Sequence, residues 1–187
     1  MLVAAACSGG VADDETASTS PSPSAAPVAM IGIDGNVRIY DRVTGATTEI
    51  TSNAGLRRVY SQPTWSPDGT RLAFVESTAA VDGVQAASPA IRVGLHAQSA
   101  PIGSVHIASV AGGETVVVTT PFPPFYLYWA PDGSQLAFLG NDASIPGQGF
   151  GLIDTTTSSV KRIDIGQPYF FAWSPASDRL LVHAENR

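Results

Sequence analysis

From Met30 onward, short apolar stretches alternate with turn residues such as Gly35-Asn36, and none of them has the 3.6-residue period of an amphipathic helix. This pattern is typical of strands joined by tight turns and predicts an all-β domain over residues 30–187. The strand-like stretches are MIGID, VRIYD, TEIT, RLAFVE, SVHIASV, TVVVTT, QLAFLG, FGLIDT, VKRIDI and RLLVHA.

One ten-residue motif occurs three times, as WSPDGTRLAF at 65–74, WAPDGSQLAF at 129–138 and WSPASDRLLV at 173–182. A structural unit that cannot bury its own apolar face must be repeated, whereas a catalytic motif usually needs one copy. Each copy fits a hairpin between the first and second strands of a four-stranded antiparallel unit, because proline and glycine suit such turns. The motif residues to which we assign this structural role are Trp65, Pro67, Asp68, Gly69, Trp129, Pro131, Asp132, Gly133, Trp173 and Pro175.

The third copy departs from the other two at its turn. Ala176 and Ser177 replace the Asp-Gly pair, so we expect this turn to be looser or differently shaped. Each tryptophan precedes its turn, where one large ring can fill the space between neighbouring sheets.

The spacing of the motif favours one architecture. Trp65 and Trp129 are 64 residues apart, and Trp129 and Trp173 are 44 residues apart, while a four-stranded propeller blade takes about 40 to 50 residues. Motif and spacing resemble the TolB-like, WD40-like repeats, also called PD40 repeats. The resemblance covers residues 30–187 and implies a β-propeller of four-stranded blades, with an unclosed β-sandwich as the main alternative.

A closed propeller has about four to eight blades. Here the pattern gives two whole blades, the end of one before Trp65 and the start of another after Trp173, or about three blades in all. We therefore expect an incomplete propeller and a chain that is a fragment of a longer protein.

The amino-terminal segment predicts a location outside the cytoplasm. Residues 1–7 end in Ala4-Ala5-Ala6-Cys7 and resemble the lipobox of a bacterial lipoprotein signal, shortened at its start. The resemblance implies that Cys7 is lipidated and anchors the protein in the bacterial cell envelope. The alternative is that Cys7 is an unmodified cysteine without a function in a disordered amino terminus. Residues 8–29 are rich in Ser, Thr and Pro and predict a disordered linker between anchor and propeller.

Composition narrows the possible partners and chemistry. The 10 basic and 16 acidic residues give a net charge of −6 with no basic stripe, so nucleic acid is not an expected partner. His96, His106 and His183 are scattered without metal-ligand spacing, and Cys7 is the only cysteine. We predict no metal, no cofactor and no catalytic residue in this chain.

Strand alternation places several loops at one rim. If the motif turns lie at one rim, the insert from Ser77 to Gly103 and the interblade connections RRVYSQP, PFPPFYLY and GQPYFF lie at the other. Arginine and aromatic residues in such loops suit protein recognition, although the rings can instead pack between blades. The candidate binding residues are Arg57, Arg58, Tyr60, Phe122, Phe125, Tyr126, Tyr169 and Phe170.

Two functional hypotheses follow. The first is a lipid-anchored envelope propeller, not itself an enzyme, that binds a protein or a cell-wall component. The second is the front propeller of a prolyl oligopeptidase-type serine peptidase, since those enzymes carry similar Trp-Ser-Pro-Asp-Gly repeats ahead of a hydrolase domain that this chain does not include.

Overall fold

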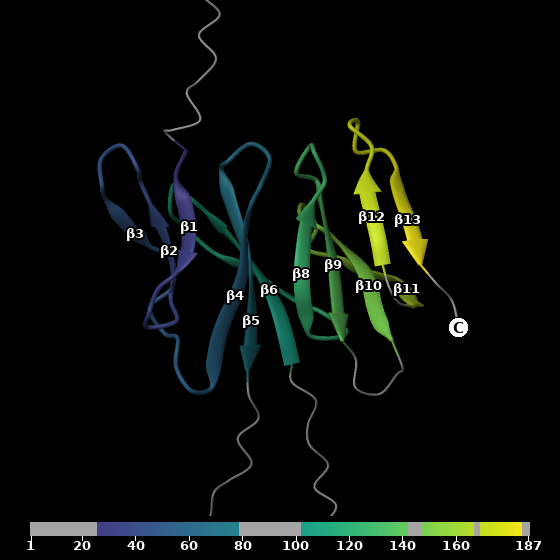
Figure 1. The fold of residues 1–187 in the computed structure, drawn as a ribbon, viewed down its shortest axis with the longest axis horizontal. Coiled ribbons are helices and arrows are strands. Elements are labelled where there is room, and N and C mark those ends of the chain that lie inside the picture. Colours follow the sequence, from purple (N-terminus) through teal and green to yellow (C-terminus); the bar gives the residue numbers. More distant parts are fainter. Residues whose placement is uncertain (1–25, 79–101, 142–146, 167–168, 185–187) are drawn as a thin grey trace, which may run out of the picture.

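The computed structural model describes residues 26–78, 102–141, 147–166 and 169–184. Within these ranges the chain forms only β-strands and turns, and the strands lie in four antiparallel sheets that follow one another along the molecule (Figure 1). This confirms the predicted all-β fold built from repeated strand units.

The second and third sheets are the complete units. Each has four strands in sequence order, and each begins with the strand that carries the motif tryptophan at its end. The second sheet consists of β4 (Arg58–Trp65), β5 (Arg71–Thr78), β6 (Ile102–Ser109) and β7 (Val116–Thr119). The third consists of β8 (Pro124–Trp129), β9 (Gln135–Asn141), β10 (Gln148–Asp154) and β11 (Val160–Gly166).

The first and fourth sheets are shorter. The first has three strands and matches the second to fourth strands of a complete unit, whereas the fourth has the two strands of the motif hairpin. The first sheet consists of β1 (Val28–Ile31), β2 (Val37–Tyr40) and β3 (Thr47–Glu49), and the fourth of β12 (Tyr169–Trp173) and β13 (Leu180–Ala184).

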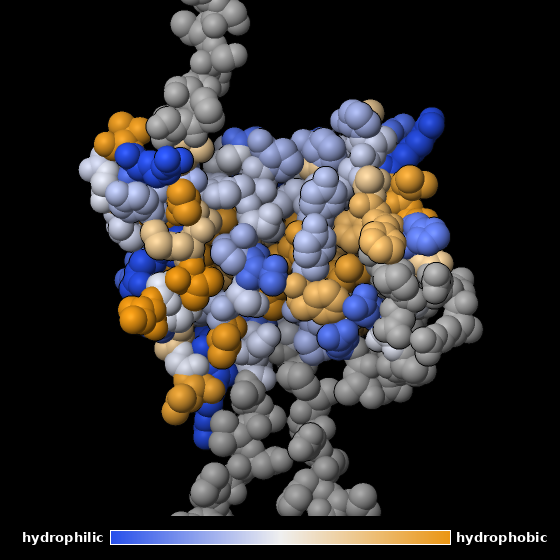
Figure 2. Space-filling model, in the orientation of Figure 1, coloured by the Kyte–Doolittle hydropathy of each residue, from blue (hydrophilic) through white to orange (hydrophobic). Residues whose placement is uncertain are grey.

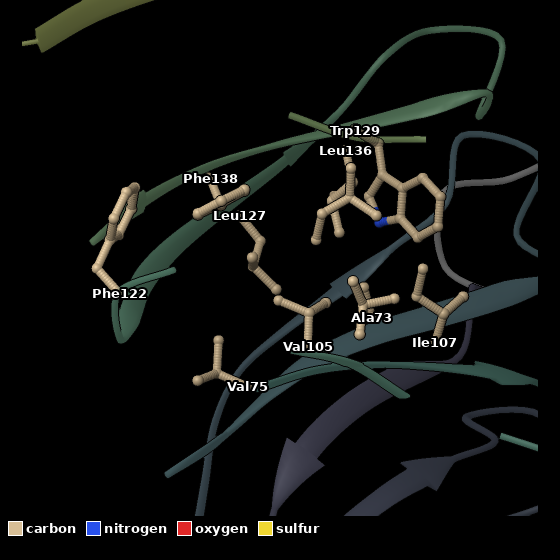
Figure 3. Packing of buried hydrophobic residues seen from close by; sticks show 11 residues of the cluster. Ala73, Val75, Val105, Ile107, Phe122, Leu127, Trp129, Leu136 and Phe138 are labelled. Atoms are coloured by element: carbon tan, nitrogen blue, oxygen red, sulfur yellow. The ribbon is translucent and has the colours of Figure 1, made fainter. Parts of the chain in front are cut away.

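Apolar side chains fill the space between each pair of neighbouring sheets. Between the second and third sheets, Val75 and Val105 from one side meet Leu127, Leu136 and other residues from the opposite side (Figure 3). Similar clusters join the first sheet to the second and the third to the fourth. Because strand side chains alternate between faces, each central sheet contributes to two clusters. This is why β5 and β9 each contain a run of four consecutive buried apolar residues, LAFV and LAFL.

Each motif tryptophan lies between its own sheet and the preceding one. Trp129 is 5% exposed, and its indole N–H donates to the carbonyl oxygen of Thr64 in the second sheet at 3.3 Å. Trp65 packs against the cluster between the first two sheets, and Trp173 against the cluster between the last two. The rings therefore link successive units at equivalent positions.

The three motif turns share one geometry, which corrects the expectation of a looser third turn. The amide of Gly69 donates to the carbonyl of Ser66, and the amide of Ser177 donates in the same way to Ser174, both at 2.9 Å. Ser177 takes the left-handed conformation, with φ of 60°, that glycine takes in the other turns. Its side-chain hydroxyl accepts a hydrogen bond from the amide of Asp132, and this contact with the neighbouring turn holds the strained residue in place.

Candidate binding surface at the rim

The two rims of the molecule differ in the segments that form them. The hairpins β4–β5, β8–β9 and β12–β13 turn at the upper rim of Figure 1, whereas β4, β8 and β12 begin at the lower rim. The segments that the sequence assigned to interblade loops are therefore mostly strand: all but one residue of RRVYSQP belongs to β4, for example. They lie at the predicted rim, but their side chains alternate between faces because they are strand residues.

The predicted rim residues separate into buried and exposed groups. Phe122, one of the candidate binding residues, takes the alternative arrangement: it is 2% exposed and its ring fills the space over Gly140 and Gly149, where neither residue has a side chain. Tyr60 is also buried, and Phe125 is half-buried. Tyr169 begins β12, and among the candidates whose side chains the structure describes, those that reach solvent are Arg57, Arg58, Tyr126 and Phe170.

A polar cluster occupies the lower part of the space between the first and second sheets. The guanidinium Nε of Arg58 donates to Glu76 Oε1 at 3.0 Å, and Nε2 of His106 lies 3.0 Å from Glu76 Oε2. The hydroxyl of Tyr60 donates to Asn53 Oδ1 at 2.7 Å. These five side chains line a hollow of about 350 Å³ that opens to solvent.

Burial controls the protonation of this cluster. The imidazole of His106 stacks on Phe74 at a centroid distance of 5.2 Å and meets the ring of Tyr60 edge-on. Its pKa is lowered because desolvation disfavours the imidazolium, although the Glu76 carboxylate opposes this effect. Desolvation and the negative charge of Glu76 both raise the pKa of Tyr60. At neutral pH the cluster therefore holds a neutral imidazole and a neutral phenol around one ion pair.

An aromatic hollow lies between the third and fourth sheets. It measures about 360 Å³ and brings together three of the predicted rim residues, Phe125, Tyr126 and Phe170, with two that the sequence did not single out, Leu139 and Phe171. Figure 2 shows apolar surface over β12 and β13, where Phe170 is 64% exposed. The predicted rim residues thus form two separate surfaces, one polar and one aromatic, rather than a single patch.

Several predictions concern residues outside the described ranges. Cys7, most of the 8–29 linker and residues 79–101 of the long insert belong to this group, so their predicted roles stay predictions. Among the described residues, no group of three or more His, Cys, Asp or Glu side chains is arranged to hold a metal ion. The described part of the chain also contains no helix that is long and apolar enough to span a membrane.

Glu76 and Asn53 are members of the polar cluster that the sequence did not reveal. The signal for Glu76 was present in RLAFVE, since alternation places it on the same face of β5 as Phe74. A carboxylate that continues an apolar strand face needs a partner. Its partner Arg58 could not be assigned, because β4 contains a bulge between Ser61 and Thr64 that shifts the face of every earlier residue.

Solved structures show which fold these sheets belong to. The chain is similar to dipeptidyl peptidase 4 from Porphyromonas gingivalis (TM-score 0.56, 15% identity), covering 78% of this chain and 25% of that one. It is similar to TolB from Acinetobacter baumannii (TM-score 0.51, 16% identity, 80% and 32% covered). It is also similar to a putative TolB from Agrobacterium tumefaciens (TM-score 0.54, 16% identity, 88% and 56% covered).

No protein-family model matches the chain, and neither does any curated protein sequence. The identities to the solved structures are low, so the likeness concerns the fold. The chain has the β-propeller fold seen in TolB and in peptidase propellers, and it spans about a quarter to just over half of the length of those chains. The predicted propeller is confirmed in preference to a β-sandwich.

Proposed function

We propose that this protein is a lipid-anchored β-propeller of the bacterial cell envelope that binds another protein, or a cell-wall component, through its lower rim. The observation that carries the proposal is the set of solvent-reaching Arg57, Arg58, Tyr126 and Phe170 at or near the starts of three successive sheets. Arginine and aromatic side chains dominate the binding energy of protein interfaces. The likeness to two TolB structures supports the same class of protein.

The anchor is tested by substituting the cysteine. In cells that produce the protein, we expect Cys7→Ala to move it from the membrane fraction to the soluble fraction. The substitution removes the residue that would carry the acyl chains, and stable anchoring needs two or more such chains. The matched control is Ser8→Ala, which leaves the acceptor thiol in place. A Cys7→Ala protein that stays in the membrane fraction would contradict anchoring through this residue.

Binding through the lower rim is tested by site-specific photo-crosslinking in the same cells. A photoreactive phenylalanine analogue at Phe170 should trap one defined envelope component, while the same analogue at Ala176, exposed in a motif turn of the opposite rim, should not. Equal trapping at both positions, or none at Phe170, would count against the proposed binding rim.

A second candidate function is the front propeller of a serine peptidase. The likeness to dipeptidyl peptidase 4, of which this chain covers 25%, favours it. The mass and the reactivity of the native protein distinguish the two candidates. A peptidase has a larger mass and reacts with a fluorophosphonate probe through its active serine. An envelope binding module does not label with that probe.

A further inference from the structure

The polar cluster lies in the second sheet, and the equivalent positions of the third sheet carry no charged residue. Strand register makes the two sheets comparable: Glu76 pairs with Ser104 between β5 and β6, as Gly140 pairs with Gly149 between β9 and β10. The same ladders pair Phe74 with His106 and Phe138 with Gly151. Glu76, Ser104 and His106 in the second sheet are therefore equivalent to Gly140, Gly149 and Gly151 in the third.

The first strands continue this equivalence. Tyr60 pairs with Glu76 and Pro124 pairs with Gly140, so Arg58 occupies the position that corresponds to Phe122, two residues earlier. In the third sheet the Phe122 ring lies over two of the glycines and fills the space between sheets. In the second sheet Arg58 stands there instead, and a hollow of about 350 Å³ remains.

The fold therefore does not require charged groups at these positions. Glu76 is only 12% exposed, and the desolvation of such a carboxylate is often only offset by the attraction of its ion-pair partner, so an apolar replacement is commonly neutral or stabilising. Glycines and one phenylalanine already provide that replacement in the third sheet of the same molecule. The Arg58–Glu76–His106 cluster is thus better explained by binding than by folding.

The charges around the hollow indicate what it binds. Glu76 is neutralised by Arg58, and His106 is held neutral by burial. A second depression of about 610 Å³ shares Asn53 and Arg58 with this hollow and is also lined by Arg57, which has no ion-pair partner among the described residues. The site has one cation in excess, so a carboxylate complements it. Leu56, which is 98% exposed, adds apolar surface beside the cation.

We propose that this rim hollow, lined by Asn53, Arg58, Tyr60, Glu76 and His106, and the depression beside it, lined by Leu56 and Arg57, together bind an extended segment of a partner protein through an acidic side chain flanked by an apolar one. The carboxylate accepts hydrogen bonds from the guanidinium groups of Arg57 and Arg58, and the apolar side chain packs against Leu56. This inference rests on the proposed protein-binding function and names the chemistry of its partner.

The experiment is an NMR titration of the ¹⁵N-labelled full chain, with the His106 ring protons as the reporter. The probe is the capped tetrapeptide Gly-Leu-Glu-Gly, and its matched control is Gly-Leu-Gln-Gly. We expect the acidic peptide to shift the His106 resonances and the backbone amides of residues 53–58, and the amide peptide to bind about tenfold more weakly. Equal binding of both peptides, or shifts confined to the aromatic hollow, would overturn the proposal.

Variants separate binding from folding. Arg57→Gln and Arg58→Gln should each lower the affinity for the acidic peptide about tenfold. The control Arg162→Gln replaces an exposed arginine on β11 and should leave the affinity unchanged. Replacing the cluster with its third-sheet counterparts, as R58F/E76G/S104G/H106G, should keep the fold and abolish the peptide-induced shifts of the backbone amides of residues 53–58, which report binding in the absence of His106. A quadruple variant that does not fold would assign the cluster to stability and overturn the inference.

The failure of this inference can be distinguished from the failure of the proposed function. If the acidic peptide does not bind but the analogue at Phe170 still traps an envelope component, the rim binds a partner of different chemistry. If neither is observed, the proposed binding function fails as well.

Discussion

Single residues set the spacing between the sheets. A Cβ atom at Gly149 would lie 2.4 Å from the ring of Phe122, and one at Gly140 would come equally close to that ring and to the carbonyl oxygen of Pro123. Real Cβ atoms do not approach so closely, so both positions need glycine for contact rather than for an unusual backbone conformation. The buried ring and the two glycines therefore act as one packing unit.

This unit gives a stability prediction. Gly149→Ala should lower the free energy of unfolding by about 1–3 kcal/mol, because the added methyl group must displace the Phe122 ring. Gly55→Ala is the matched control, since a Cβ atom there meets no atom within 4 Å, and it should change stability by less than about 0.5 kcal/mol. Urea denaturation measures both values. Equal effects of the two substitutions would contradict the packing of Phe122 against glycine.

At the scale of strands and turns, side-chain links hold successive hairpins together. Arg71, just after the first motif turn, donates to the carbonyl oxygen of Gly133 at 2.7 Å and to the hydroxyl of Thr155 at 3.1 Å. Its guanidinium also lies 4.9 Å from the ring centroid of Trp129. One side chain of the second sheet thus contacts three residues of the third.

The corresponding residue of the third motif copy provides a control. Arg71→Met should destabilise the protein by about 1–3 kcal/mol, because it removes two hydrogen bonds and a cation–π contact between sheets. Arg179→Met changes the same motif position, but that side chain is 86% exposed, so it should cost less than about 0.5 kcal/mol. Thermal unfolding of both variants checks the difference, and equal melting temperatures would contradict the role of Arg71.

The elements were predictable from the sequence to different degrees. Period-two alternation and the repeated Pro-Asp-Gly turns predicted the hairpins, because both patterns act over a few residues. The third turn was predicted wrongly, since the contact that holds Ser177 in the left-handed conformation comes from Asp132 in another sheet. The polar cluster could not be predicted, because the bulge in β4 shifts the register by one residue and so exchanges the faces on which the residues before it lie.

At the scale of the whole molecule, repetition explains both the fold and the candidate site. Successive sheets bury one face against the preceding unit and the other against the following one, which is the arrangement of propeller blades. Against this repeated background, departures are informative. The space between the first and second sheets contains charges and a hollow where the next one contains glycine and phenylalanine.

We propose that this hollow binds an acidic segment of a partner protein. The most direct measurement is a set of intermolecular nuclear Overhauser effects between the acidic tetrapeptide and the isotope-labelled chain. The proposed binding mode predicts contacts from the peptide leucine methyl groups to Leu56 and from the glutamate methylene protons to the Arg58 side chain. Contacts to Phe170 and Phe171 in the aromatic hollow, with none to Arg58, would contradict it.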